Sequence, residues 1–99
     1  MYVYVKIYYE GEDQSVLAVC DEEVLGKVLR EGDIVLDVSN DFFNGFKTHV
    51  DDVPHLLEGV TSAMLVGENT VKKAIDAGYV HPEAVLRVNQ VPYAYLVKV

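Results

Sequence analysis

The sequence contains a single cysteine, no tryptophan, only three prolines and no long apolar run. One cysteine excludes a framework of intramolecular disulfides, so the fold must depend on packing. A membrane-spanning helix needs about 20 consecutive apolar residues, and no segment approaches that length. The N-terminus also lacks the basic and then apolar pattern of a secretion signal. We therefore expect a cytosolic, reduced protein.

Basic residues are scarce as well: eight lysines and arginines stand against 16 aspartates and glutamates, a net charge of −8. This charge disfavours direct binding of nucleic acid and of anionic membranes. The imbalance lies in residues 1–58, which hold 13 acids and four bases, whereas residues 59–99 hold three acids and four bases. Acidic clusters are usually solvated turns and helix starts; the functional alternative is an acidic face that meets a basic partner.

The remaining composition is that of an ordinary globular domain, with 51% hydrophobic and 24% charged residues in a chain of 99. This length corresponds to one domain, residues 1–99, and no repeat or linker divides it. We expect an α/β fold, with α+β as the alternative. The expected architecture is a single compact domain in which an N-terminal hairpin and two to three helices accompany a mixed sheet of six or seven short strands.

Alternating apolar residues and turn signals predict where the elements lie. The strands are expected at residues 2–9 and 15–20 (the hairpin), 33–39, 62–66, 84–88 and 92–99. Asn44-Gly45 predicts a tight turn, and the short apolar segment 62–66 is typical of a buried parallel strand. Helices are expected between Asp21 and Gly32, at 51–58 and at 70–77, because apolar residues recur there at helical spacing between capping residues.

The junction between strand 62–66 and the following helix is the first candidate site. Gly67, Glu68 and Asn69 form the turn, and a helix N-terminus at the edge of a parallel strand presents free N–H groups to anions. Lys72 and Lys73 lie near the helix start, where the helix dipole disfavours cations unless an anion is bound. The alternative is a capped helix with two exposed lysines.

Cys20 is the second candidate, because a thiol just before a helix N-terminus can be an activated nucleophile. The neighbouring acids argue against activation, and a buried structural thiol is the alternative. If it shares a site with Gly67, the two residues must lie at the same edge of the sheet. The three histidines have no paired-ligand spacing, so we expect neither a metal nor another cofactor.

Tyrosine is the third candidate, with seven in the chain. Alternation in strand 2–9 places Tyr2, Tyr4, Lys6 and Tyr8 on one face, and Tyr93 lies with Tyr95 on a face of the last strand. Aromatic and lysine side chains on a sheet favour either stacking on bases or anchoring a protein partner. The alternative is a half-buried face covered by a helix.

Three segments, taken together in order and spacing, resemble a known family: residues 20–27 (CDEEVLGK), 63–68 (AMLVGE) and 91–94 (VPYA). The family is that of short archaeal proteins known as domain of unknown function 424. The resemblance spans nearly the whole chain and implies an archaeal cytosolic protein without an established activity. Met64 stands where the family tends to have Asn, and Tyr93 where it tends to have His, which counts against an enzymatic site here.

These observations favour a non-catalytic binding or adaptor module in archaeal information processing, and association with translation is one form of this hypothesis. A protein or ribonucleoprotein is the expected partner. The alternative is a small anionic-ligand-binding protein, or an enzyme, with its site at Gly67–Asn69. A homo-oligomer built through an edge strand is a third hypothesis.

Overall fold

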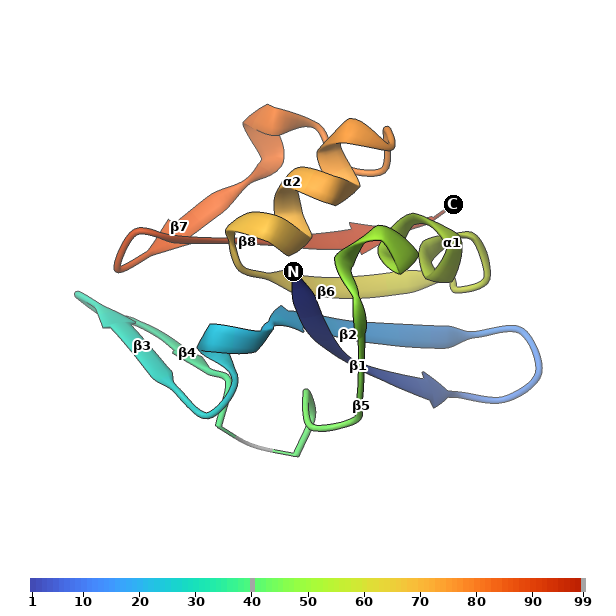
Figure 1. Ribbon diagram of the computed structural model, residues 1–99, viewed down its shortest axis with the longest axis horizontal. Helices are drawn as coiled ribbons and strands as arrows, with labels where there is room; N and C mark the ends of the chain where they lie inside the picture. Colours follow the sequence, from blue (N-terminus) through green and yellow to red (C-terminus); the bar gives the residue numbers. More distant parts are fainter. Residues whose placement is uncertain (40, 99) are drawn as a thin grey trace.

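The computed structural model describes residues 1–39 and 41–98. Its strands are β1 (Tyr2–Tyr9), β2 (Ser15–Asp21), β3 (Val28–Glu31), β4 (Ile34–Asp37), β5 (Phe46–His49), β6 (Ser62–Val66), β7 (Leu86–Val88) and β8 (Val91–Val97). Its helices are α1 (Val53–Glu58) and α2 (Glu68–Asp76), with short 3-10 helices η1 (Glu22–Val24), η2 (Val50–Asp52) and η3 (Pro82–Ala84) (Figure 1).

The described residues form a six-stranded sheet in the order β5-β1-β2-β6-β8-β7 and a separate two-stranded sheet, β3–β4. Strands β2 and β6 are parallel, whereas the other neighbours in the large sheet are antiparallel. The expected mixed sheet and N-terminal hairpin are therefore confirmed. With two helices beside a largely antiparallel sheet, the architecture is a single α+β domain.

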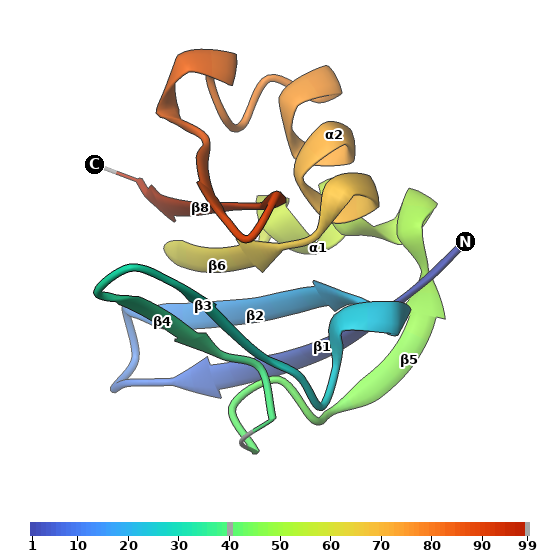
Figure 2. The same cartoon turned by 90° about the vertical axis from the view of Figure 1, so that its left-hand side faces the viewer.

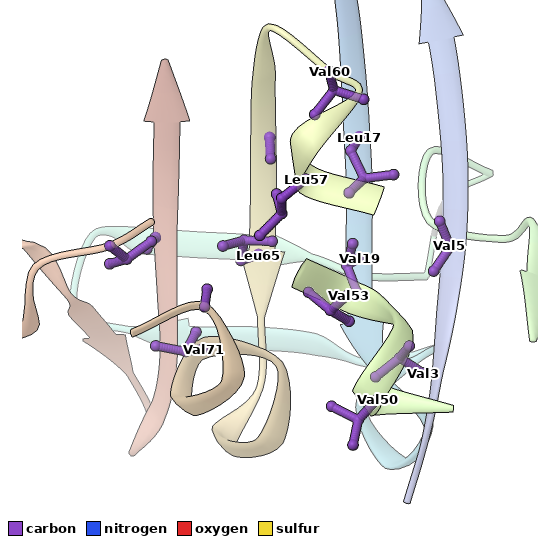
Figure 3. Packing of buried hydrophobic residues seen from close by; sticks show 14 residues of the cluster. Val3, Val5, Leu17, Val19, Val50, Val53, Leu57, Val60, Leu65 and Val71 are labelled. Atoms are coloured by element: carbon purple, nitrogen blue, oxygen red, sulfur yellow. The ribbon is translucent and has the colours of Figure 1, made fainter. Parts of the chain in front are cut away.

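One face of the sheet packs against the two helices. Val5, Val19, Leu65 and Ala94 are cross-strand neighbours, and this row across four strands is at most 1% exposed. Leu57 of α1 is fully buried above the row (Figure 3). Burial of a leucine or valine side chain stabilises a fold by about 1.5–3 kcal/mol, so this layer is the main core.

The opposite face of the sheet is covered by the β3–β4 hairpin, which crosses in front of β2 in Figure 2. Leu29 and Val38 from this second layer are buried in one cluster with Ala18 and Met64 of the sheet. The hairpin tip is tied to the β7–β8 turn, because the backbone N–H of Asn89 donates to the Glu31 carboxylate over 2.7 Å. The protein therefore consists of three layers: helices, sheet and hairpin.

The prediction of a helix between Asp21 and Gly32 is wrong, because this segment contains η1 and then β3. Gly26 has φ +92°, which ends the 3-10 turn, and its N–H donates to the carbonyl of Val38 over 3.0 Å. Gly32, with φ +60°, takes the first position of a two-residue hairpin turn, where glycine is favoured. The segment expected to be a helix therefore supplies the first half of a hairpin.

The other elements follow the sequence more closely. The helix expected at 51–58 is η2 and α1 with Pro54 in the first turn of α1, and the helix expected at 70–77 is α2, which begins two residues earlier at Glu68. The turn before β5 lies earlier than the tight turn predicted at Asn44-Gly45: the Asn44 N–H donates to the Asp41 carbonyl over 3.2 Å, so Phe42 and Phe43 are its central residues. The strand expected at 92–99 is β8, and its last residue, Val99, lies outside the described residues.

Candidate functional site

The N-terminus of α2 is capped by a carboxylate from a neighbouring strand. Asp21 ends β2, which runs parallel to β6, so both strands lead to the same edge of the sheet. Asp21 is 1% exposed, and its Oδ2 accepts from the Asn69 backbone N–H over 2.9 Å. Its Oδ1 accepts from the N–H and the Oγ1 hydroxyl of Thr70, over 2.8 and 2.7 Å. The protein's own carboxylate thus lies where a bound anion would meet the helix dipole.

Gly67 makes this arrangement possible. Its φ is +112°, which side-chain-bearing residues rarely adopt, and a Cβ added there would lie 2.7 Å from both Cβ and Oδ1 of Asp21. The missing side chain is the space that the Asp21 carboxylate fills. Gly67 lies at the strand–helix junction, as the sequence predicts. The prediction that Asp21 caps a helix starting at its own position is wrong, because Asp21 caps α2 instead.

The structure brings Cys20 to the same junction, because Cys20 and Val66 are paired across β2 and β6. The Cys20 side chain is fully buried on the hairpin side of the sheet. Burial, together with the negative charge of Asp21, raises the pKa of the Cys20 thiol to about 12. A thiol in this state is protonated at neutral pH and is a poor nucleophile.

The two lysines of the candidate ligand site make different contacts. Lys72 pairs with Asp76 over 2.8 Å, one helical turn along α2. Lys73 pairs with Asp51 of η2 over 2.8 Å, and this hydrogen bond lowers the pKa of the Asp51 carboxyl. Neither of these contacts involves the N-terminus of α2. The anion site at Gly67–Asn69 stays a prediction, and the geometry gives it little support.

A shallow pocket of about 370 Å³ lies beside α2 instead, with Glu68, Lys72 and Arg87 among its lining residues. Arg87, from β7, donates to the Glu68 carboxylate over 3.1 Å and to the Gln90 carbonyl over 3.0 Å. Sequence reasoning missed Arg87, because its approach to α2 depends on the non-local pairing of β7 with β8.

The tyrosine face of β1 is largely occupied by the chain itself. The Tyr8 hydroxyl donates to the Phe42 carbonyl over 2.9 Å, and the two rings stack with centroids 5.0 Å apart. Lys6 donates through Nζ to the Asp41 carbonyl over 3.0 Å. Tyr4 is half-buried against the hairpin-side cluster. The loop before β5 and the hairpin, rather than a helix, cover this face.

The remaining tyrosines named as partner candidates lie far apart on the sheet. Tyr2 is exposed near the edge strand β5, and the Nζ of Lys47 lies 4.9 Å from its ring centroid. Tyr93 is buried in the hairpin-side cluster. Its neighbour Tyr95, which meets it edge to face, is 68% exposed. A partner surface that includes all the named tyrosines and Lys6 stays a prediction, and the structure points to Tyr95 as the more accessible residue.

Tyr95 borders a largely apolar pocket of about 400 Å³, which we call the sheet–hairpin groove. Two cross-strand rows of the sheet contribute to its floor, with Val16, Ser62 and Val97 in one row and Met64 and Tyr95 in the next. The wall comes from β4 and the loop that follows it. The full lining is Val16, Leu36, Asp37, Phe42, Phe43, Ser62, Ala63, Met64, Tyr95, Leu96 and Val97.

The groove continues into a second hollow with acidic residues in its lining. Val16, Ser62 and Val97 line both, and the second hollow adds Glu10 and Asp13 from the β1–β2 loop. Lys98 also lines the second hollow, and its Nζ donates to the carbonyls of Leu57 and Glu58. Asp37 of β4 is also among the lining residues of the groove, and its Oδ1 accepts from the backbone N–H and the hydroxyl of Ser39 over 2.8 and 2.5 Å. The surface is therefore an apolar trough with carboxylates among its lining residues and in the adjoining hollow. Sequence reasoning missed it because the trough depends on strand order and register, although the alternation in β8 had placed Tyr93 and Tyr95 on one face.

Fold and site together define a small α+β protein with an open apolar groove on one face of its sheet. The family model described as protein of unknown function (DUF424) matches residues 9–99, so the chain belongs to the DUF424 family. The resemblance drawn from the sequence motifs is thereby confirmed.

A crystal structure of an uncharacterized conserved protein from Methanopyrus kandleri has the same fold, with a TM-score of 0.80 and 24% sequence identity. The alignment covers 100% of this chain and 95% of that chain. The comparison with curated proteins gives no match. Among the helices described here, none is long and apolar enough to cross a membrane.

Proposed function

We propose that this protein is a non-catalytic binding module whose partner is a basic protein segment held in the sheet–hairpin groove. The observation that carries the proposal is the groove itself: Tyr95 and Val97 are 68% and 71% exposed on its floor. Exposed apolar patches on small proteins mark interaction sites, and tyrosine is a preferred anchor of protein interfaces. Asp37 in the groove lining and Glu10 and Asp13 in the adjoining hollow make a basic partner the complementary one.

The setting we propose is archaeal and cytoplasmic information processing, with translation as the first process to examine. Many proteins of that machinery must be basic because they bind RNA. The acidic surface of this chain favours contact with such a protein over contact with RNA. The buried, protonated Cys20 thiol and the backbone hydrogen bonds accepted by His49 and His81 give these residues structural roles, which supports binding over catalysis.

A pull-down from an archaeal lysate tests this function when it includes a matched pair of tyrosine variants. Tyr95→Ala removes the exposed anchor of the groove, whereas Tyr9→Ala removes a tyrosine of similar exposure, 77%, outside the groove lining. We expect basic proteins, identified by mass spectrometry, to be retained by wild type and Tyr9→Ala and lost from Tyr95→Ala. Retention should survive nuclease treatment. Equal capture by both variants contradicts a role for the groove, and loss on nuclease treatment shows RNA bridging.

The shallow pocket beside α2 supports a second candidate, a small anionic ligand, because Lys72 and Arg87 both line it. Each cation already has a carboxylate partner, so a ligand must displace Asp76 or Glu68. Thermal unfolding with and without pyrophosphate tests this candidate. A ligand present at 100 times its Kd stabilises a protein by about 2.7 kcal/mol, which gives a clear rise in Tm. No change in Tm at millimolar pyrophosphate removes pyrophosphate as a ligand.

A further inference from the structure

Strand β4 is an edge strand with few of the features that protect other edges. In the described part of the chain it pairs with β3 and with no other strand. Its sequence, Ile-Val-Leu-Asp, has neither lysine nor proline, and Ile34 and Val35 are 46% and 53% exposed. The edges of the large sheet are better protected: β5 carries Lys47, and β7 has three residues and carries Arg87. Natural proteins use short strands and charged residues to prevent edge pairing. β4 is also short, at four residues, but its one charged residue, Asp37, stands at its end and its exposed residues are apolar, so it is the least protected of these edges.

The hairpin register shows which backbone groups lie on that edge. The Val38 N–H donates to the Lys27 carbonyl over 2.8 Å, and Glu31 pairs with Ile34 at the two-residue turn. Residues of an antiparallel pair alternate between inward and outward hydrogen-bonding directions. Ile34 and Leu36 therefore direct their backbone groups toward β3. The N–H and C=O of Val35 point away from β3, along the outer edge.

This outer edge borders the sheet–hairpin groove. Leu36 and Asp37 of β4 line the groove, whereas no residue of β3 does. The side of β4 that faces away from β3 is thus the side next to the apolar floor. A chain hydrogen-bonded to β4 at the usual strand spacing of about 4.8 Å would place alternate side chains over Met64 and Tyr95.

The charges around β4 select the partner. Residues 27–41 carry four acids, Glu31, Asp33, Asp37 and Asp41, and two bases, Lys27 and Arg30. Arg30 lies on β3, where it pairs with Val35, so it is on the side of β4 away from the outer edge. A second copy of β4, paired antiparallel with Val35 opposite Val35, would place Asp33 opposite Asp37, and like charges directly opposite are destabilising. An extended segment with lysine or arginine on one face and apolar residues on the other matches both the charge and the groove.

We propose that β4 binds an extended basic segment of a partner protein as an added strand, with the alternate apolar side chains of that segment in the sheet–hairpin groove. This inference rests on the proposed function and specifies how the partner binds. Strand addition is an established mode of peptide recognition, in which backbone hydrogen bonds supply affinity and pockets for alternate side chains supply specificity.

The test uses a fluorescein-labelled peptide of alternating lysine and valine, and a glutamate–valine peptide as its charge-reversed control. Val35→Pro removes the outward N–H while leaving the bonds to β3 intact, and proline is tolerated on the open side of an edge strand. Val35→Thr keeps the N–H and is the matched control. We expect Val35→Pro to weaken binding of the lysine–valine peptide about tenfold or more, since it loses a hydrogen bond and adds a steric block.

Amide NMR spectra of the 15N-labelled protein supply the second readout. Strand addition shifts the Val35 amide and slows its hydrogen exchange, and Val35→Pro and Val35→Thr should both keep the spectrum of a folded protein. One result would overturn strand addition while leaving groove binding in place. In it, the peptide shifts the amide signals of Tyr95 and Val97 but not that of Val35, and Val35→Pro and Val35→Thr bind the lysine–valine peptide equally well. Absence of binding at millimolar lysine–valine peptide, preference for the glutamate–valine peptide, or a dimer of the free protein formed through β4 also overturns the inference.

Discussion

At the residue scale, the most informative side chain is Asp21. This residue ends β2, and its carboxylate accepts hydrogen bonds from the free backbone N–H groups at the start of α2. Asp21→Ala leaves the two backbone N–H groups and the Thr70 hydroxyl without their acceptor in a buried place. This variant loses the helix cap and leaves buried hydrogen-bond donors without acceptors. We therefore expect the free energy of unfolding to fall by about 2–4 kcal/mol. Urea unfolding followed by circular dichroism measures it.

Glu23→Ala is the matched control for Asp21→Ala, because Glu23 is an exposed acid of the adjacent 3-10 helix. Exposed substitutions usually change stability by less than about 0.5 kcal/mol. If the two variants unfold at the same urea concentration, the Asp21 carboxylate does not stabilise α2 as described.

Cys20 gives a prediction that depends on pH. Because burial raises its pKa from 9.0 to about 12, the folded state holds the thiol proton more tightly than the unfolded state does. The resulting stabilisation is complete below pH 9 and is lost as the pH rises from 9 toward 12. We expect the difference in unfolding free energy between wild type and Cys20→Ala to shrink over the accessible part of that range, and native wild type to resist a disulfide thiol reagent at pH 8. Rapid labelling without denaturant would contradict this assignment.

At the scale of elements, the segment between Asp21 and Gly32 shows that local sequence patterns alone do not determine its secondary structure. The apolar residues at helical spacing also suit a turn followed by a strand, and the deciding contacts are with Val38, a residue distant in sequence. The hairpin of β1 and β2, β6 and α2 were predictable because their signals are local: alternation, capping and glycine stops. The Asp21–Thr70 contact and the groove were not predictable, since both depend on which strands are neighbours.

Leu29 and its neighbour Val28 distinguish the hairpin from the helix by measurement. In an amphipathic helix with Val24, Leu25, Val28 and Leu29 on its stripe, both alanine variants would destabilise similarly. In β3, Leu29 is 6% exposed and Val28 is 42% exposed. We therefore expect Leu29→Ala to lower the unfolding free energy by about 2–4 kcal/mol and Val28→Ala by less than about 1 kcal/mol. Equal losses in urea unfolding would argue for the helix.

At the scale of the whole molecule, the dominant feature is a net charge of −8 concentrated in the first 58 residues. In the described part of the chain, four lysine or arginine side chains form ion pairs with carboxylates: Lys47–Glu22, Lys72–Asp76, Lys73–Asp51 and Arg87–Glu68. Each is at the surface, where such pairs contribute about 0–1 kcal/mol. With twice as many acids as bases, we expect repulsion among the carboxylates to outweigh these pairs and to act on the folded state more than on the expanded one.

Salt should therefore stabilise this protein. Raising NaCl from about 20 mM to about 500 mM shortens the Debye length from roughly 20 Å to below 5 Å, which screens repulsion across the surface. We expect the Tm to rise by several degrees in calorimetry. The double variant Glu12→Lys and Asp13→Lys, in the exposed β1–β2 loop, changes the net charge from −8 to −4 and should raise the Tm at low salt and reduce its salt dependence. A Tm that falls with salt would mean that the surface ion pairs outweigh the repulsion. The acidic face would then be neutralised within the molecule, which would weaken the case for a basic partner.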